Sequence, residues 1–126
     1  MSVELHLGDC LDVMRGMADN SVSLIVTDPP YYKVKGEAWD RQWDTAEGFL
    51  SWVRDLCAEW HRVLAPNGSL YVFASPKMAA RVECIIGERF NVLNHIVWSK
   101  SDEPTHALKY GDDRFRQFVH KSERII

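Results

Sequence analysis

A long amphipathic segment between two short apolar runs constrains the fold of this chain more than any other feature. Residues 44–64 place their apolar side chains on one face of a 3.6-residue repeat, which predicts a helix. The flanking runs, residues 22–26 and 69–75, are short and apolar enough to be buried strands. Strands that alternate with helices are typical of a parallel sheet. The sequence therefore predicts an α/β fold with a mainly parallel sheet and helices on both faces.

Further segments carry weaker patterns. Alternating apolar residues in 3–9 predict a short strand that ends in a turn, and helical spacing in 11–17 predicts a short helix. A second helix is expected over 76–89, a strand within 91–100, and the start of a last strand at 123–126.

The long helix also has recognisable end signals. Asp44 is the expected N-cap, with Glu47 three residues later as in a capping box. Gly68 is expected to adopt a left-handed turn after the helix.

Composition limits the classes of protein. The 126 residues are enough for one small domain, and the net charge of −3 is not that of a typical nucleic-acid-binding protein. No run of about 18 apolar residues and no signal peptide is visible, so we expect a cytoplasmic protein without a membrane partner. Three cysteines and five histidines lack ligand spacing, so we expect reduced thiols and no metal site.

The tetrapeptide Asp28-Pro29-Pro30-Tyr31 directly follows the first buried strand. Proline has no N–H and ends a central strand, and a residue that precedes proline is held extended. The Asp28 carboxylate and the Pro29 carbonyl are therefore two acceptors close together, with the Tyr31 ring beside them. An amino group on a flat ring suits this arrangement. Two acceptors that hold both its N–H bonds favour the pyramidal nitrogen whose lone pair can attack an electrophile. The alternative is an ordinary turn.

Other candidates have open alternatives. Asp9 follows the expected first strand, and parallel strands would bring it to the same edge as Asp28, although Gly-Asp is often only a turn. Trp39 and Trp43 could stack on bases or pack on the core. The cations Lys33, Lys35, Arg41 and Lys100 could meet phosphates or active groups, or lie on the solvated surface.

The segments LGDC, DNSVSLIVTDPPYY, WD, HRVLAPNGSLYVF and IVWSK, in this order, resemble the N-terminal half of DNA amino-methyltransferases of the circularly permuted β-class. The nearest likeness is to adenine-N6 enzymes of the phage and prophage kind, over residues 3–126. The resemblance implies a Rossmann-like class I methyltransferase fold. It also implies methyl transfer from S-adenosyl-L-methionine to the amino group of an adenine flipped out of DNA.

The resemblance also implies roles for individual residues. Asp28, Pro29 and Tyr31 would hold the target adenine, and Pro30 would rigidify the turn. A serine in place of Asp28 is associated with cytosine, so the aspartate favours adenine. Asp9 would accept the amino group of the cofactor's adenine, beside the Cys10 backbone, with Asp28 also facing the cofactor. Trp39 and Asp40 would belong to the loop that closes over the base.

The chain departs from this family in one large respect, because its seven glycines never form a G-x-G turn. We therefore expect a partial catalytic domain over residues 1–126: a truncated gene, a split subunit or a cropped segment. Alone, it should be inactive, with residues 3–7 poorly placed or paired with a wrong strand, and with an exposed edge at 22–26 that self-associates or binds a complementing C-terminal half. The alternatives are a non-catalytic prophage remnant or partner subunit, and a cytosine-N4 or RNA adenine methyltransferase.

Overall fold

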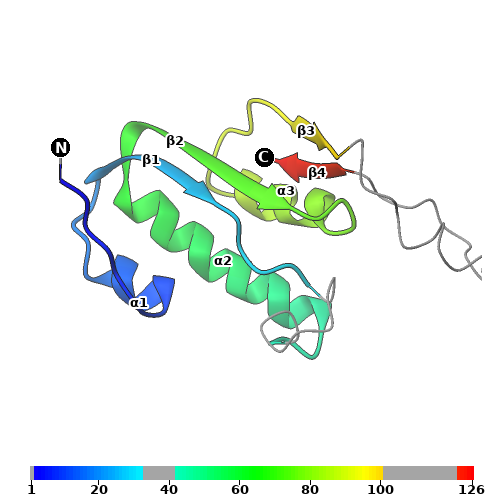
Figure 1. Ribbon diagram of the computed structural model, residues 1–126, viewed down its shortest axis with the longest axis horizontal. Coiled ribbons are helices and arrows are strands. Elements are labelled where there is room, and N and C mark those ends of the chain that lie inside the picture. Colours follow the sequence, from blue (N-terminus) through cyan, green and yellow to red (C-terminus); the bar gives the residue numbers. More distant parts are fainter. Residues whose placement is uncertain (1, 33–41, 101–121) are drawn as a thin grey trace, which may run out of the picture.

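The protein is described by a computed structural model over residues 2–32, 42–100 and 122–126. Its elements, in chain order, are α1 (Cys10–Arg15), β1 (Val22–Thr27), α2 (Ala46–Val63), β2 (Leu64–Ala74), α3 (Ala79–Gly87), β3 (Ile96–Ser99) and β4 (Ser122–Ile125) (Figure 1). The two expected long elements, the helix after residue 44 and the strand up to residue 75, are both present.

The strands form one sheet in the order β1-β2-β4-β3. β1 and β2 are parallel, with Thr27 opposite Val72. β4 is antiparallel to both of its neighbours, so β3 runs in the same direction as β1 and β2. Within the described residues three of the four strands run in the same direction, as predicted, and β4 between β2 and β3 makes the sheet a mixed one.

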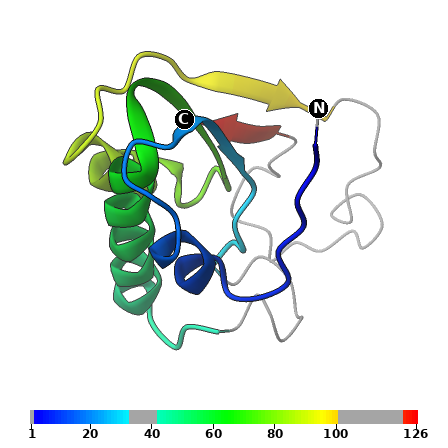
Figure 2. The same cartoon turned by 90° about the vertical axis from the view of Figure 1, so that its left-hand side faces the viewer.

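Helices α2 and α3 lie together on one face of the sheet (Figure 2). Most buried residues of the core come from these two helices and from the sheet, and Met14 of α1 joins them: Met14, Phe49, Val53, Leu56, Cys57, Trp60, Val72, Ala74, Met78, Ala79, Val82, Ile85, Ile86 and Ile126. On β1, Leu24 and Val26 are 55% and 61% exposed, while Ile25 between them packs against the core. The sequence predicts helices on both faces of the sheet, and the helices in the described part of the chain cover one face.

Helix α2 forms where the apolar stripe predicts it, but its cap differs. Thr45 is the N-cap, and its hydroxyl accepts a hydrogen bond of 3.0 Å from the Gly48 N–H. The prediction of Asp44 was wrong by one residue. Gly68 is also explained differently, because it lies within β2 and is not left-handed. A Cβ there would lie 2.7 Å from Leu64 Cγ, so close packing requires the glycine.

The turn between α1 and β1 is fastened to α2 by the Arg62 guanidinium. It donates to the Met14 carbonyl at 2.6 Å, to the Met17 carbonyl at 2.9 Å and to Glu59 Oε2 at 2.7 Å, and it also pairs with Asp19 at 2.5 Å. These bonds satisfy carbonyls at the end of a helix of six residues, which has little stability of its own.

Residues 3–7 do not form the strand that their alternation predicts. Val3, Leu5 and Leu7 are 83%, 91% and 106% exposed. An isolated strand has no ladder to join. Of the two expectations for this segment, its exposure agrees with poor placement and not with pairing to a wrong strand. No helix in the described ranges is long and apolar enough to cross a membrane.

Candidate active site

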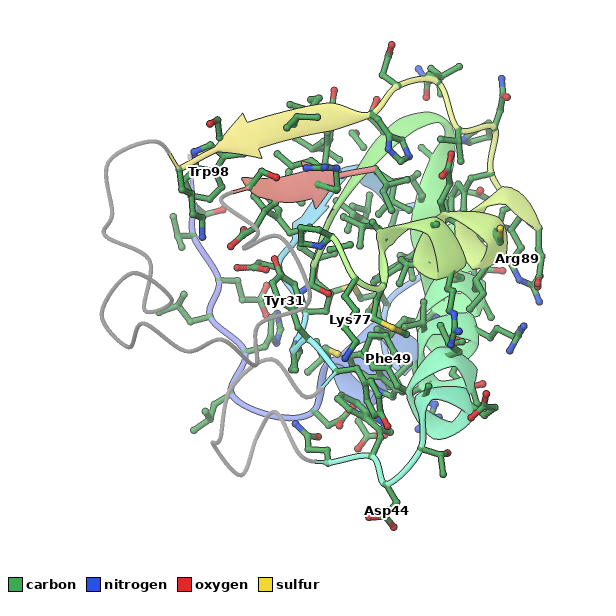
Figure 3. The ribbon with its side chains drawn as sticks, turned by 90° about the vertical axis from the view of Figure 1, so that its right-hand side faces the viewer. Tyr31, Asp44, Phe49, Lys77, Arg89 and Trp98 are labelled. Atoms are coloured by element: carbon green, nitrogen blue, oxygen red, sulfur yellow. The ribbon has the colours of Figure 1, made fainter. Side chains whose placement is uncertain are left out.

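The carboxyl ends of three strands, β1, β2 and β3, lie at one edge of the sheet. The arrowheads of β1 and β2 point to the right in Figure 1, and Figure 3 views the molecule from that side. β1 ends at Thr27, and Asp28 follows it as an exposed residue. Pro29 and Pro30 are half-buried and cannot extend the ladder. Tyr31 lies at the same edge, with its ring half-buried (Figure 3).

The Tyr31 hydroxyl interacts with two carboxylates, those of Glu123 and Asp28. It donates a hydrogen bond of 3.3 Å to Glu123 Oε2, across 92 residues of sequence. Burial raises the pKa of the Tyr31 phenol, and the hydrogen bond and charge of Asp28 raise it further, followed by those of Glu123. The phenol therefore stays protonated and can act as a donor well above neutral pH.

Glu123 is held from its other side by Lys100. The two form an ion pair in which the Glu123 side chain is 17% exposed. The Lys100 ammonium also lies 4.9 Å from the centre of the Trp98 ring, where a cation is attracted by the π face. Lys100 is therefore a surface lysine, with its side chain 40% exposed, that also pairs with Glu123 at this edge.

Sequence reasoning missed Glu123. Its position follows from the pairing of β3 with β4, in which Ser99 faces Ser122 and Trp98 faces Glu123. The available signals were WSK at the end of one expected strand and SERII at the start of another. Without the register, neither segment shows that the two strands pair in an antiparallel direction.

Asp9 is positioned by a helix and not by a strand. It is the N-cap of α1, and its Oδ1 accepts a hydrogen bond of 2.8 Å from the Leu11 N–H. The structure records no contact between Asp9 and Asp28 among the described residues. An exposed carboxylate that accepts but does not donate fits the amino group of an adenine. Cys10 begins α1, and partial desolvation, followed by the Asp9 charge, raises the pKa of its thiol.

The loop candidates have different outcomes. Trp39 and Asp40 lie outside the described residues, as do Lys33, Lys35 and Arg41. Trp43 packs against Phe49 and Trp52, with ring centres 5.1 Å and 4.7 Å apart. The core interpretation is therefore confirmed for Trp43. Across the described ranges, no group of three or more His, Cys, Asp or Glu residues could hold a metal ion.

Solved proteins that share this fold include two DNA methylases. A DNA modification methylase from Thermus thermophilus, TTHA0409, matches with a TM-score of 0.68 and 25% identity, over 94% of this chain and 48% of that one. A second structure of TTHA0409 is complexed with S-adenosyl-L-methionine (TM-score 0.68, 24% identity, 95% of this chain and 52% of that one). The cytosine-N4-specific PvuII DNA methyltransferase matches with a TM-score of 0.73 and 18% identity, over 95% and 46%.

Sequence comparison gives the same result. The chain is 32% identical to the DNA adenine methyltransferase YhdJ of Escherichia coli (strain K12) over 108 residues, which are 82% of this chain and 35% of YhdJ. It thus spans about a third of that relative's length, and about half of TTHA0409. The family model for N6 and N4 methyltransferases, described as DNA methylase, matches residues 22–126. The chain therefore belongs to the DNA methylase family of N6 and N4 methyltransferases.

Proposed function

We propose that residues 1–126 form the base-binding part of an enzyme that methylates the N6 amino group of adenine in DNA, with S-adenosyl-L-methionine as the methyl donor. The observation that carries the proposal is the position of Asp28, Pro29 and Tyr31 directly after β1, in a chain that belongs to this family. In parallel sheets ligands bind beyond the carboxyl ends of the strands, which is where these residues lie.

The proposed chemistry uses these residues as acceptors and as a stacking surface. The Asp28 carboxylate and the Pro29 carbonyl each accept one N–H of the target amino group. The nitrogen becomes pyramidal, and its lone pair is available for the new N–C bond. Tyr31 stacks on the base, which must leave the duplex because its amino group is otherwise paired. The proton is lost after the methyl group arrives, so Asp28 orients the amino group more than it acts as a strong base.

The cofactor would supply an electrophilic methyl group. Asp9 would accept a hydrogen bond from its adenine amino group, beside the Cys10 backbone, and Asp28 would face the methyl-bearing end. The Asp9 Oδ1 atom already accepts the Leu11 N–H, so Oδ2 is the oxygen proposed to bind. TTHA0409 crystallised with S-adenosyl-L-methionine supports this choice of cofactor.

Adenine is preferred over cytosine as the target for two reasons. Asp28 occupies the position where a serine is associated with cytosine, and the 32% identical relative YhdJ is a DNA adenine methyltransferase. The likeness to the cytosine-N4-specific PvuII enzyme is the argument for the cytosine-N4 alternative, but at 18% identity that likeness concerns the fold alone.

The test is a methyl-transfer assay on duplex oligonucleotides, followed by digestion to nucleosides. It uses residues 1–126 alone and a chimera in which they replace the matching segment of YhdJ. Radiolabel in N6-methyladenine from the chimera is the expected result, and label in N4-methylcytosine or RNA would support those alternatives. A folded chimera that labels nothing would favour the non-catalytic remnant or partner subunit.

A further inference from the structure

The Tyr31 phenol has one proton to donate and two carboxylates beside it. Glu123 accepts this proton at 3.3 Å, and Asp28 also interacts with the same hydroxyl. The two acids differ in setting. Glu123 is largely buried and is fixed by Lys100, whereas Asp28 is exposed at the end of β1.

This difference has a consequence for the target amino group. An Asp28 oxygen that accepts from Tyr31 is less able to accept from a base, because that lone pair is already used. Resting on the function proposed above, we propose that Glu123 is a positioning residue. It takes the Tyr31 hydrogen bond and so leaves Asp28 free to bind the amino group of the target base.

Lys100 is the second residue in this proposal, because it fixes the Glu123 carboxylate. Two carboxylates that interact with one hydroxyl repel each other, and a cation beside one of them offsets this repulsion. Lys100 directly follows β3 and lies beside the Trp98 ring, and it pairs with Glu123 Oε1, whereas Tyr31 donates to Oε2. The pair therefore holds the Glu123 oxygens toward the phenol without contacting the base. The Tyr31–Glu123 distance is long for O–H···O, and such contacts shorten in complexes with substrate.

The first test needs no catalysis and uses residues 1–126. The chain contains four tyrosines, so 13Cζ labelling gives four resonances, and Tyr31→Phe identifies the one that belongs to Tyr31. The Tyr31 resonance is followed from about pH 3 to about pH 7, where carboxylates titrate. The expected result is a step that Glu123→Gln removes and Asp28→Asn leaves in place. A step that Asp28→Asn removes and Glu123→Gln leaves in place would overturn the proposal.

The second test uses the chimera and looks for rescue. Glu123→Ala should lower kcat about tenfold with little change in KM for DNA, since Tyr31 then donates to Asp28. Adding Tyr31→Phe removes that donor and should restore kcat to the level of Tyr31→Phe alone. If the double variant is as slow as Glu123→Ala, Glu123 has only a structural role and the proposal fails.

Glu83→Ala is the matched control, because Glu83 Oε2 also lies beside a basic side chain, His95 Nε2 at 3.1 Å, but on α3 away from this edge. It should leave kcat unchanged. A chimera without any methyl transfer would contradict the proposed function, while the Tyr31 resonance would still decide the role of Glu123.

Discussion

Val72 and Ile126 exchange both of their backbone hydrogen bonds, with N···O distances of 2.9 Å and 3.0 Å. This pair ties the last residue of the chain to β2, in the middle of the sheet. Glu123 lies three residues earlier, so the same ladder brings its side chain to the edge where β1 ends. The candidate site therefore depends on a strand that is near Tyr31 in space and far from it in sequence.

Ile126→Ala is expected to destabilise the chain and disturb the site together. The side chain is 8% exposed and belongs to the core, so its truncation should cost about 2–4 kcal/mol. Urea unfolding measures the loss, and the Tyr31 13Cζ resonance reports whether Glu123 has moved. Ile125→Ala, at a half-buried neighbouring position, is the control and should cost less. Equal losses at the two positions would contradict this account of the core.

Asp28→Ala should lower methyl transfer by the chimera about a hundredfold or more. The substitution removes one of two acceptors that tighten as the nitrogen becomes pyramidal. Asp28→Asn keeps one acceptor oxygen, so its rate should fall between those of Asp28→Ala and the unchanged protein. Asp12→Ala, at an exposed acid of α1, is the control and should have no effect. Single-turnover kinetics and cofactor titration separate the chemical step from binding. Turnover of Asp28→Ala within a few fold of the unchanged protein would rule out this role.

Tyr31 is expected to act on the base through its ring face. Tyr31→Phe should retain most activity in the chimera, whereas Tyr31→Ala should lose about 1–3 kcal/mol of base binding. Fluorescence of 2-aminopurine at the target position measures base extrusion in each variant. Tyr71→Ala, which removes an exposed tyrosine from β2, is the control. Equal extrusion by Tyr31→Ala and the unchanged protein would contradict a stacking role.

The parts of the fold that local pattern determines are the parts that the sequence predicts. The apolar stripe of α2 is long enough to identify a helix without its neighbours, and the two prolines after Thr27 end a strand wherever it lies. Residues 3–7 show the limit of this reasoning. Their alternation is that of a strand, but a strand also needs a partner for its backbone groups, and pattern alone does not supply one.

The candidate site divides in the same way. Asp28, Pro29 and Tyr31 are contiguous, so their sequence alone indicates an acceptor pair beside an aromatic ring. Glu123 and Lys100 join them through the register of β3 and β4, which four-residue strands do not reveal. The position of β4, antiparallel between two strands that run in the same direction, depends on contacts between residues that are far apart in sequence. It could not be predicted from the short segment at 122–126.

The Arg62 cluster predicts a dependence of stability on pH. The hydrogen bond from Arg62 lowers the pKa of Glu59 below its ordinary value, and the Arg62 charge adds to this. A carboxylate whose pKa is lower in the folded state stabilises above its unfolded pKa, and this contribution is lost as pH falls through the folded pKa. The unchanged protein should therefore have a higher Tm than Glu59→Gln at pH 7, and the difference should shrink as the pH falls below about 4.

Thermal unfolding at several pH values measures this difference. Asp55→Asn, at an exposed acid on the same helix, is the control and should shift Tm little. If the Tm difference between the unchanged protein and Glu59→Gln stays constant down to the acid transition, the Arg62–Glu59 pair does not act through its charge.

Residues 1–126 alone are expected not to bind S-adenosyl-L-methionine usefully and not to methylate DNA. Asp9 offers one contact for the cofactor's adenine, from a segment whose preceding residues are almost fully exposed. No glycine turn of the G-x-G type is present to approach the methionine end, and one hydrogen bond contributes only about 0.5–1.5 kcal/mol against the cost of immobilising a ligand. Isothermal titration calorimetry should show no micromolar binding to this segment, whereas the chimera should bind. Micromolar affinity or clear methyl transfer by residues 1–126 would show that Asp9 and Asp28 are sufficient for the cofactor without a G-x-G turn.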